Sequence, residues 1–521
     1  MALRPIIAEG KRLRKLFIGI AVVLGVLVCI FLIMLASGTV NLDSPRMALN
    51  LLIGLEGPPA DAQKVEQRFS VPDGFSLELY AKDLPKARFM RFTPDGDLLV
   101  SRPHRGDVLL LRRDQNGDGH PDAVETLLKD LKRPLGLDIA GDYLYVAESN
   151  RIGRAAFDSP SGTLTGPYEP LVEDFTDNGN HWTKTLRVGP DGLLYLAQGS
   201  TCNVCEEKDE RRSTIMRFQR DGSGGEILAT GLRNSVGFDW APWSGQLYAT
   251  DNGRDLLGDD FPDCELNLIE EGRFYGWPYF NNDNIPDPDM GADPLAGIRE
   301  PTPPVHGFRP HNAPLGITFV DSSGWPADYE RVALTALHGS WNRSIADGYK
   351  VVSLHWTEKG IEERDFLAGF NKNGDIAGRP VDIAQGPDGA IYISDDYAGA
   401  IYRVRYNAGA TDPSPPMEAA TISRLDSAAP AWLADADLAA MADNGAALYE
   451  KYGCRSCHED GESPKLLTGL SDRLGYTATI DTLQTPQSPM PAFPFTEMEQ
   501  RELAVFLLNP DASPAPADME F

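Results

Sequence analysis

Residues 93–100 read Thr-Pro-Asp-Gly-Asp-Leu-Leu-Val, and the stretches 189–196 and 386–393 repeat this pattern. In each of them a Pro-Asp-Gly turn precedes a short apolar run. Proline presets φ and glycine accepts positive φ, so the pattern favours a tight turn between two strands. The prolines of the three turns are 96 and 197 residues apart, near two and four multiples of a unit of about 48 residues, which is typical of a propeller blade.

Looser copies of the pattern occupy the gaps between the three turns. They lie at 137–147, 237–250 and 316–337, so that six units fill residues 66–408. Six such units predict a mainly β fold, a six-bladed β-propeller. Closure of the ring hides the strand edges and brings loops from all blades to a central channel. The fold alone does not decide the function, because propellers also act as simple binding platforms.

Composition narrows the classes of function. The chain has 521 residues and a formal net charge of -28 at pH 7. Such an acidic surface argues against a nucleic-acid partner and for an exported protein. The length leaves room for about two to four domains, so we expect further modules beside the propeller.

The N-terminal segment predicts a membrane anchor. Five Lys and Arg residues within 1–16 precede the run 17–36, which contains no charged residue. The run is long enough to span a bilayer. Positive charge before it predicts a single pass of the bacterial inner membrane, with a cytoplasmic N-terminus and a periplasmic remainder. A cleaved signal peptide is the alternative, but its apolar region is normally shorter. Residues 37–65 lack periodicity and are predicted to be a linker.

Residues 454–458 read Cys-Arg-Ser-Cys-His, a pattern typical of c-type haem attachment. Cys454 and Cys457 would bond the vinyl groups of the haem, and His458 would bind the iron. Met490, between two prolines, is the predicted second axial ligand. The alternative is a redox or zinc CxxC followed by a chance histidine.

The sequence around this motif predicts a small all-α domain. A helical pattern over 444–451 leads into the motif, and Thr496 with Glu499 forms a capping box that opens a helix through Leu508. Met498 on that helix is a weaker candidate for the axial ligand. The boundaries that follow are 409–432 for a linker rich in Pro, Ala and Ser, 433–513 for a domain that resembles a class I cytochrome c with one haem, and 514–521 for a tail.

The remaining cysteines divide by position. Cys202 and Cys205 form a second CxxC, but Glu206 stands where a haem motif needs histidine. In an oxidising compartment these two cysteines favour a local disulfide, with Cys264 free or an alternative partner. Cys29 lies within the predicted membrane span.

Polar residues suited to chemistry gather in loops at the ends of predicted strands. His181 and Trp182 stand at the entrance to a strand of the third unit, and Arg233-Asn234 opens the next unit. The other loops are 251–278, which is acidic and contains DCELNLI and YGWP, 338–343, which contains His338 and Arg343, and 379–382, which contains Arg379. We expect the last two at matching positions of the last two blades.

These stretches resemble the soluble pyrroloquinoline quinone-dependent sugar dehydrogenases, particularly the sorbosone and aldose dehydrogenase branch. His181, Arg233-Asn234, DCELNLI at 263–269 and YGWP at 275–278 occur in the same order on a six-bladed pattern. The resemblance covers nearly all of residues 66–408. It implies that the protein uses pyrroloquinoline quinone (PQQ) and Ca²⁺.

The resemblance also implies a role for each side chain. His181 would be the base that takes the hydroxyl proton while hydride leaves the carbon, because neutral imidazole titrates near working pH. Arg233 would polarise the quinone carbonyl, and Asn234 would help to hold the cofactor. The backbone carbonyls of Gly253 and Arg254 would place Ca²⁺ against the quinone.

The three carboxylates of the quinone need basic partners. Arg379 matches one arginine of the family, whereas Val381 stands where a second is expected. His338 lies near the position of the family's lysine, and Arg343 is close by. These departures fit the sorbosone branch better than the glucose branch. An ordinary surface pairing of both arginines with nearby Asp is the alternative.

Three tryptophans in these loops could stack on a sugar. They are Trp182, Trp277 and Trp341. Aromatic residues also fill blade cores, so the sequence does not choose among them.

A separate loop at 114–122 has oxygen-bearing side chains at alternating positions. Asp114, Asn116 and Asp118 are spaced as in a calcium loop, with a glycine at the bend. The twelve-residue pattern is incomplete, because His120 replaces a usual ligand. A structural Ca²⁺ and a solvated turn are the two interpretations.

The leading hypothesis is a membrane-anchored quinohaemoprotein that oxidises an aldose, sorbosone or related sugar aldehyde. Electrons would pass from PQQ to haem c and then to a membrane or periplasmic acceptor of the respiratory chain. A non-enzymatic binding propeller with an electron-relay cytochrome is the alternative. A calcium-dependent lactonase would need several carboxylates and asparagines around one Ca²⁺, and these loops are richer in arginine and histidine.

Overall fold

The protein divides into two compact units, Met1–Pro416 and Met417–Phe521. The predicted segments 1–16, 17–36, 409–432 and 514–521 lie outside the described residues. No helix in the described part of the chain has the length and apolar character to cross a membrane. The structure, a computed structural model, describes residues 57–291, 300–406, 438–452, 454, 476, 479–480, 483, 493 and 495–508.

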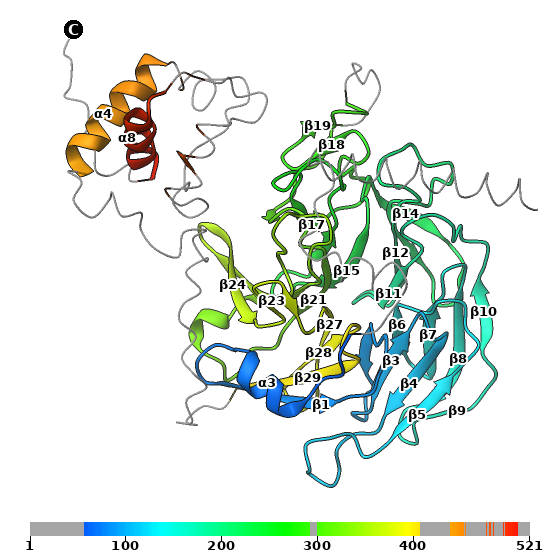
Figure 1. Ribbon diagram of the computed structural model, residues 1–521. Helices are drawn as coiled ribbons and strands as arrows, with labels where there is room; N and C mark the ends of the chain where they lie inside the picture. The colour runs from blue at the N-terminus through cyan, green and yellow to red at the C-terminus, as the bar shows by residue number, and fades with distance from the viewer. Residues whose placement is uncertain are drawn as a thin grey trace, which may run out of the picture. The chain divides into compact units, whose positions relative to one another are not determined.

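Six antiparallel sheets follow one another around a ring in the first unit, and Figure 1 shows them in chain order. The predicted six-bladed propeller is confirmed. Blade 1 contains β2 (Met90–Phe92), β3 (Leu98–Arg102), β4 (Asp107–Leu111) and β5 (Val124–Leu128). Blade 2 contains β6 (Leu137–Ala140), β7 (Tyr143–Ala147), β8 (Ile152–Asp158) and β10 (Glu169–Val172), with β9 (Thr163–Leu164) paired to β8. Blade 3 contains β11 (Lys184–Val188), β12 (Leu194–Gln198), β13 (Thr214–Phe218) and β14 (Glu226–Thr230).

The second half of the ring has the same strand order. Blade 4 contains β15 (Ser235–Trp240), β16 (Leu247–Asp251), β17 (Cys264–Ile269) and β20 (His306–Phe308). Blade 5 contains β21 (Pro314–Phe319), the short helix η1 (Ala327–Tyr329), β22 (Val332–Leu337), β23 (Lys350–Thr357) and β24 (Gly360–Leu367). Blade 6 contains β27 (Pro380–Gln385), β28 (Ile391–Asp395), β29 (Ala400–Tyr406) and, from the other end of the unit, β1 (Phe75–Ala81).

The three Pro-Asp-Gly turns connect the first and second strands of blades 1, 3 and 6. In each turn the glycine N–H donates to the carbonyl three residues earlier, as Gly96 does to Thr93 at 2.9 Å. Glycine is required there because its φ is positive, +94° at Gly96. The prediction of a uniform 48-residue period is wrong for the second half. The 197 residues between the last two prolines cover three blades rather than four, because two hairpins are inserted, β18 (Phe280–Asn281) with β19 (Ile285–Pro286) and β25 (Asn371–Lys372) with β26 (Asp375–Ile376).

The strand order determines which loops meet. Each first strand contacts the first strands of both neighbouring blades, so these strands surround the central channel. In an antiparallel sheet, the connection before the first strand and the connection between the second and third strands lie at the same end. We call this end of the ring the loop face. The Pro-Asp-Gly turns lie at the opposite end.

The predicted boundary at residue 65 is wrong, because the propeller unit begins earlier. Helix α3 (Ala62–Arg68) starts at Asp61, whose side chain accepts a hydrogen bond from the Lys64 N–H. Val65 of this helix is buried in the core cluster that includes strands of blades 5 and 6. Gly57 also donates to the Tyr397 carbonyl at 2.8 Å. Residues 57–65 therefore belong to the propeller unit rather than to a linker.

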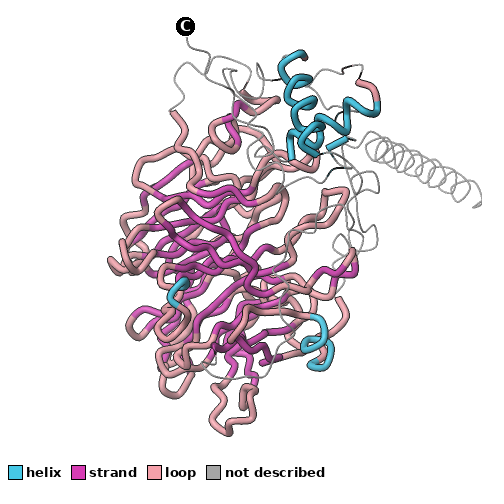
Figure 2. The backbone as a smooth tube through the Cα atoms, turned by 90° about the vertical axis from the view of Figure 1, so that its left-hand side faces the viewer, coloured by secondary structure: helices cyan, strands magenta, loops and turns pink. Residues whose placement is uncertain are grey.

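Two helices pack against each other in the second unit, and Figure 2 shows them in cyan. They are α4 (Leu438–Lys451) and α8 (Glu497–Leu508). A Cβ on Gly445 would lie 2.2 Å from the Glu502 carbonyl, so a small residue permits the close crossing. The predicted capping box is confirmed, since Thr496 N donates to the Glu499 carboxylate at 2.8 Å and Glu499 N to the Thr496 hydroxyl at 3.3 Å.

The haem residues are only partly within the described residues. Cys454 is half-buried against the cluster that contains Leu448 and Leu503. Cys457, His458 and Met490 lie outside the described residues. Met498, the weaker ligand candidate, faces away from the core with 56% of its surface exposed. The cytochrome c domain stays a prediction.

Close approach of neighbouring first strands generates a test of the propeller. A Cβ on Gly237 would lie 2.1 Å from the Leu315 carbonyl and 2.8 Å from the Ile317 N, both of the next blade. We expect Gly237→Ala to lower the free energy of unfolding by about 1–3 kcal/mol, because backbone must move to admit the methyl group. Urea unfolding followed by circular dichroism measures this. Gly166→Ala, whose Cβ would meet a side-chain methyl at 3.3 Å, is the control. Equal stabilities of the two variants would contradict the packing argument.

Candidate functional site

Polar side chains from all six blades gather on the loop face. Some stand before a first strand and others follow a second strand. Those before a first strand are Arg88, Arg133, His181, Arg233, Asn234, His311, Asn312 and Arg379. Those after a second strand are His104, Arg254, His338, Arg343 and Asp396, and the backbone carbonyl of Gly253 stands beside Arg254. The expectation that His338 and Arg379 occupy matching positions is wrong, because His338 follows β22 and Arg379 precedes β27. Both nevertheless lie on the loop face.

His181 is held by the connection between β12 and β13. Its Nδ1 lies 3.1 Å from the Ser200 carbonyl oxygen and 2.8 Å from the Ser200 hydroxyl. A carbonyl oxygen only accepts hydrogen bonds, so Nδ1 carries the proton and Nε2 has the lone pair. Burial, and then the charge of Arg233, lowers the pKa of His181 to about 3. The expectation that His181 titrates near working pH is wrong, because the sequence did not reveal its burial beside a cation.

The guanidinium group of Arg233 is buried, with 5% of the side chain exposed. Its donors are matched by acceptors from two loops. It donates to the carbonyl oxygens of Asn203 at 3.0 Å, Asn252 at 3.1 Å and Gly253 at 2.8 Å. It also donates to the Asn203 side-chain oxygen at 2.8 Å and pairs with Asp255 at 3.0 Å. Arg233 is therefore a rigidly held positive charge near His181.

The backbone that carries Arg233 is fixed by the buried carboxyl group of Asp251. This group accepts the N–H of Arg233 at 2.8 Å and that of Asn234 at 2.5 Å. The Asn234 side-chain oxygen is buried, and no described residue gives it a hydrogen bond. Asn234 and His181 both lie against Gly199, where an added Cβ would meet them at 2.4 and 2.7 Å. A ligand donor at this place would satisfy the Asn234 oxygen.

A second cluster on the loop face combines residues of blades 1, 5 and 6. Arg88 pairs with Asp396 at 2.7 Å, and Arg379 donates to the carbonyl oxygen of His338 at 3.2 Å. His338 gives its Nδ1 proton to the Pro380 carbonyl at 3.0 Å. Burial, and then Arg379, lowers the pKa of His338 to about 3, so this ring is neutral. His338 therefore supplies a hydrogen-bonding group rather than a positive charge.

This cluster fits an additional anion. Arg88 and Arg379 lie beside one ion-pairing carboxylate, Asp396. The neighbouring Asp395 carboxyl, whose pKa burial raises to about 7, is occupied by backbone N–H groups, including that of Arg379 at 2.9 Å. The Arg88 Nε is buried without an acceptor among the described residues. Buried positive charge in excess is costly, so a ligand carboxylate would be stabilised here.

Arg343 and Arg254 are engaged in other contacts. Arg343 donates to the carbonyl oxygens of Asp259 and Pro310 and so fixes the acidic loop. Arg254 forms ion pairs with Asp287 at 2.7 Å and with Asp289 at 2.8 Å. Arg343 also lies 3.5 Å from the Asp260 carboxylate, but it is buried rather than part of an ordinary surface pair.

The described arrangement does not fit a calcium ion at the Gly253 carbonyl. Arg233 donates to that oxygen at 2.8 Å, and its positive charge would repel the ion. A calcium ion there requires Arg233 to give up this bond. We therefore assign no step to calcium at Gly253 and Arg254.

Residues 69–268 and 298–407 match the family model described as TrAA12-like. These residues make up more than half of the chain.

The chain belongs to the TrAA12-like family. The resemblance to PQQ-dependent sugar dehydrogenases is thus confirmed at the level of the family. An uncharacterized protein of Borreliella burgdorferi is 29% identical over 66% of this chain and 93% of its own length. Aldose sugar dehydrogenase YliI of Escherichia coli is 24% identical over 50% of this chain and 74% of its own length. A PQQ-dependent sugar dehydrogenase of Hypocrea jecorina is 24% identical over 64% of this chain and 89% of its own length.

Solved structures share the fold of the TrAA12-like propeller. A Trichoderma reesei protein of carbohydrate-active enzyme family AA12 superimposes with a TM-score of 0.56 at 22% identity, over 65% of this chain and 97% of that one. The PQQ domain of pyranose dehydrogenase from Coprinopsis cinerea, in its holo form, superimposes with a TM-score of 0.55 at 21% identity, over 67% of this chain and 98% of that one. These identities establish the fold alone.

The tryptophans of this TrAA12-like chain differ in exposure. Trp277 is buried and donates to the Asn203 carbonyl at 3.2 Å, so it is part of the loop core. Trp182 lies under the Arg133 guanidinium, 4.6 Å from it. Trp341 has 45% of its surface exposed. Trp341 is thus the most accessible stacking surface of the three.

The loop 114–122 lies at the end of the ring opposite the loop face, because it connects the third and fourth strands of blade 1. Asp114 accepts three backbone N–H groups of the loop, and Asn116 and Asp118 each accept one. Glu125, at the last position of the calcium pattern, pairs with Arg112 at 2.9 Å instead. A structural calcium ion there stays a prediction.

The predicted disulfide between Cys202 and Cys205 is confirmed. These two cysteines and Glu207 form the only group of His, Cys, Asp and Glu side chains in the described residues that is close enough to share a metal. The disulfide removes both thiolates, so the group is not a metal site. Cys264 is buried, and burial raises the pKa of its thiol to about 11.

Sequence reasoning missed Asn203, Arg88, His104, His311 and Asp396. The repeat could have indicated them, since each stands at the same kind of strand end as a residue that was found. Their contacts join loops of different blades, and no local pattern reveals such pairings.

The electrostatic link between Arg233 and His181 can be tested in the protein without substrate. Arg233→Gln should raise the pKa of His181, which nevertheless stays below 6.5 because burial, the larger cause, remains. In the native protein the folded pKa is depressed. The stabilisation by neutral His181 is therefore complete above pH 6.5 and decreases as the pH falls toward about 3. NMR titration of ¹³C-labelled histidines measures the pKa, with His181→Asn for assignment.

Arg217→Gln is the matched control, because Arg217 lies on β13 and pairs with Glu226 rather than acting on His181. An unchanged His181 pKa in Arg233→Gln would show that the two groups are not coupled.

Proposed function

We propose that the propeller unit is a PQQ-dependent dehydrogenase that oxidises an aldose, sorbosone or related sugar aldehyde. The observation that carries this proposal is His181, a half-buried neutral imidazole with its lone pair on Nε2, beside the fixed charge of Arg233. Relatives named as an aldose sugar dehydrogenase and as a PQQ-dependent sugar dehydrogenase support the same class of reaction.

The described side chains have distinct tasks in this reaction. When bound, PQQ accepts hydride from the carbon that carries the substrate hydroxyl. His181 takes the hydroxyl proton at Nε2. The proton on its Nδ1 stays there, hydrogen-bonded to Ser200. Arg233 stabilises the negative charge that develops beside it, and its held geometry avoids a reorganisation cost. Asn234 offers its unpaired oxygen to a donor of the ligand.

Two arginines of the loop face would hold carboxylates of the cofactor. Arg379 and Arg88 lie in one buried cluster with a single ion-pairing carboxylate, Asp396. Guanidinium groups bind carboxylates in a planar, bidentate geometry, which orients the ligand as well as binding it. The neutral, buried His338 lies near both arginines and adds no charge to this cluster.

We further propose that electrons leave the propeller unit through one haem c. Cys454 and Cys457 would bond the haem, and His458 and Met490 would bind its iron. The packed pair α4 and α8 beside Cys454 supports a small helical domain. The anchor at 17–36 would place both units on the periplasmic side of the inner membrane, where a membrane or periplasmic acceptor of the respiratory chain takes the electrons.

Reconstitution of the full-length protein with PQQ and Ca²⁺ tests this function. Dye-linked turnover should appear with at least one sugar or sugar aldehyde of a panel, and the haem band should be reduced in the same cuvette. His181→Ala should lower kcat by about 10²–10⁴-fold, because general-base catalysis contributes that much. His306→Ala, a histidine that pairs with Glu363 on outer strands, should retain activity.

Two outcomes of this experiment would count against the proposal. Full turnover by His181→Ala removes the assigned base. PQQ binding without dye reduction by any sugar favours a binding propeller with a relay cytochrome.

The arginine cluster makes a separate prediction about cofactor affinity. Arg379→Gln should weaken PQQ binding at least about tenfold, because a hydrogen bond to a charged group contributes about 1.5–3 kcal/mol. Absorbance titration of the apoprotein with PQQ measures the affinity. Arg187→Gln, whose side chain pairs with Asp239 at the opposite end of the channel, should bind PQQ as the native protein does. Equal affinities of native protein and Arg379→Gln would exclude Arg379 from the cofactor site.

A further inference from the structure

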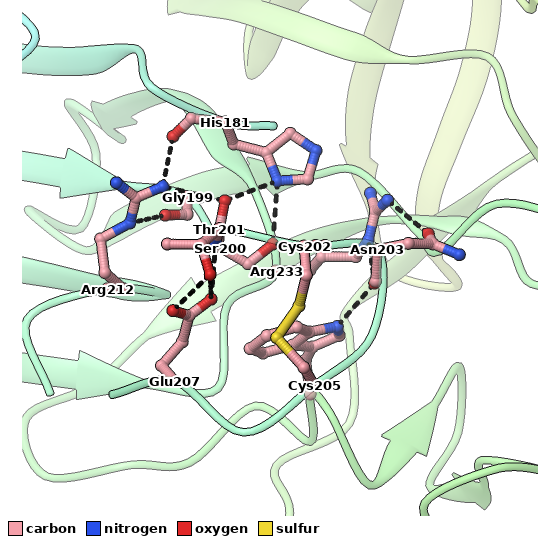
Figure 3. Close-up of a disulfide and its surroundings, with 11 residues drawn as sticks. His181, Gly199, Ser200, Thr201, Cys202, Asn203, Cys205, Glu207, Arg212 and Arg233 are labelled. Atoms are coloured by element: carbon pink, nitrogen blue, oxygen red, sulfur yellow. Dashed lines mark hydrogen bonds between the residues drawn. A yellow bond between two sulfur atoms is a disulfide. The ribbon is translucent and has the colours of Figure 1, made fainter. Parts of the chain in front are cut away.

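The loop closed by the Cys202–Cys205 disulfide contacts Arg233 directly and His181 through Ser200. It belongs to the connection between β12 and β13 on the loop face, and Figure 3 shows it in one view with His181 and Arg233. The cysteines are three positions apart, so the bridge closes a very short ring. Neither haem attachment nor metal binding accounts for these cysteines. We call residues 202–205 the disulfide loop.

Asn203 inside the disulfide loop supplies two of the five acceptors of Arg233. Its carbonyl oxygen accepts from Nε at 3.0 Å, and its side-chain oxygen accepts from Nη2 at 2.8 Å. The same amide group bonds the backbone of Asp255 twice, at 2.8 Å to its N–H and at 2.9 Å to its carbonyl. Asn203 thereby joins the loops of blades 3 and 4 around the guanidinium group.

The other side of the disulfide loop reaches His181 through Ser200. The Ser200 hydroxyl donates its one proton to the Cys202 carbonyl at 2.7 Å. Toward His181 the hydroxyl oxygen can then only accept, at 2.8 Å from Nδ1. The Cys202 carbonyl and the Ser200 carbonyl therefore both favour the tautomer with the lone pair on Nε2.

The direction of both contacts depends on backbone groups of the disulfide loop. The carbonyl of Cys202 points to Ser200 and that of Asn203 to Arg233. Bridging Cys202 to Cys205 restricts the rotation of the peptide planes between them, whereas an open loop of four residues with no strand pairing would sample other directions. A ring this short constrains the unfolded chain little, so its removal should affect local geometry more than global stability.

We propose that the disulfide loop is a positioning element of the site: Asn203 orients Arg233, and the Cys202 carbonyl, through Ser200, orients His181. This inference rests on the proposed function for its catalytic meaning, but its geometric content concerns the protein alone. Asn203 is a positioning residue, because it acts through Arg233 and not on the substrate.

The pKa of His181 in the apoprotein reports the position of Arg233 without any turnover. Asn203→Ala and the double variant Cys202→Ser/Cys205→Ser should raise this pKa, because Arg233 moves away from the imidazole and its positive charge then lowers the pKa less. In the native protein the ¹⁵N chemical shifts of the His181 ring should indicate a single tautomer. In the double variant they should indicate a mixture of both tautomers.

Kinetics of the reconstituted enzyme give a second reading. Asn203→Ala and the double cysteine variant should lose about tenfold or more in kcat, with KM changed less than threefold, because Arg233 acts on the charge that develops in the reaction. Thr201→Val is the matched control. Its hydroxyl bonds Glu207 at 2.9 Å and touches neither Arg233 nor His181. The His181 pKa and kcat of this variant should therefore equal those of the native protein.

Three results would overturn the proposal. The first is a native His181 pKa and native kcat in a folded Asn203→Ala protein. The second is an equal effect of Thr201→Val, which would mean that any loosening of the connection suffices. The third is a purified native protein with two free thiols or a bound metal at Cys202 and Cys205.

Failure of a variant to fold does not block the test. Reducing the disulfide of the folded native apoprotein with a phosphine should raise the His181 pKa in the same way, and an unchanged pKa after complete reduction rejects the proposal. Absence of sugar oxidation by the native enzyme would reject the proposed function while leaving these apoprotein measurements valid.

Discussion

Strand β1 pairs with β29 from Phe75 opposite Tyr406 to Ala81 opposite Ile401, and this pairing closes the ring with the two ends of the propeller chain. The ion pair between Glu78 and Arg403 joins residues 325 positions apart across the same seam. The Arg88–Asp396 pair on the loop face also crosses it, since Arg88 precedes blade 1 and Asp396 belongs to blade 6. The cluster of Arg88, Arg379 and Asp396 therefore exists only in the closed ring, and the proposed cofactor site depends on long-range strand pairing.

Buried carboxyl groups at the ends of the propeller strands hold the loops that carry the site. Glu148, Asp251 and Asp395 each stand at the end of a second strand and accept backbone N–H groups of the connection before the first strand of the same blade. Burial raises the pKa of both Asp251 and Asp395 to about 7. A raised carboxyl pKa contributes stability that is complete at low pH and is lost as the pH rises through about 7. At neutral pH the buried carboxyl groups of Asp251 and Asp395 therefore lower the stability of the fold, while they hold the backbone of Arg233 and Arg379 in place.

Local chemistry determined which parts of this architecture could be predicted. The Pro-Asp-Gly turns, the capping box at Thr496 and the Cys202–Cys205 disulfide depend on residues close in sequence, and all three predictions are correct. The regular period failed where blade 4 contains the hairpin β18–β19, because insertions in loops leave no periodic trace. Asn203 was missed because its proposed role depends on a contact with Arg233, which is 30 positions away and belongs to another blade.

The low pKa of His181 needs a physical account if this residue is to act as a base. Two causes lower it, burial and then the charge of Arg233. Burial persists when a ligand binds, but the second cause weakens as soon as negative charge appears beside the guanidinium. Each increment of negative charge near Arg233 then makes Nε2 a stronger base. Because Arg233 is fixed by Asn203 and Asp251, it does not move toward that charge and relax the coupling. In the proposed reaction, proton removal by His181 and charge development next to Arg233 would therefore assist each other through one immobile cation.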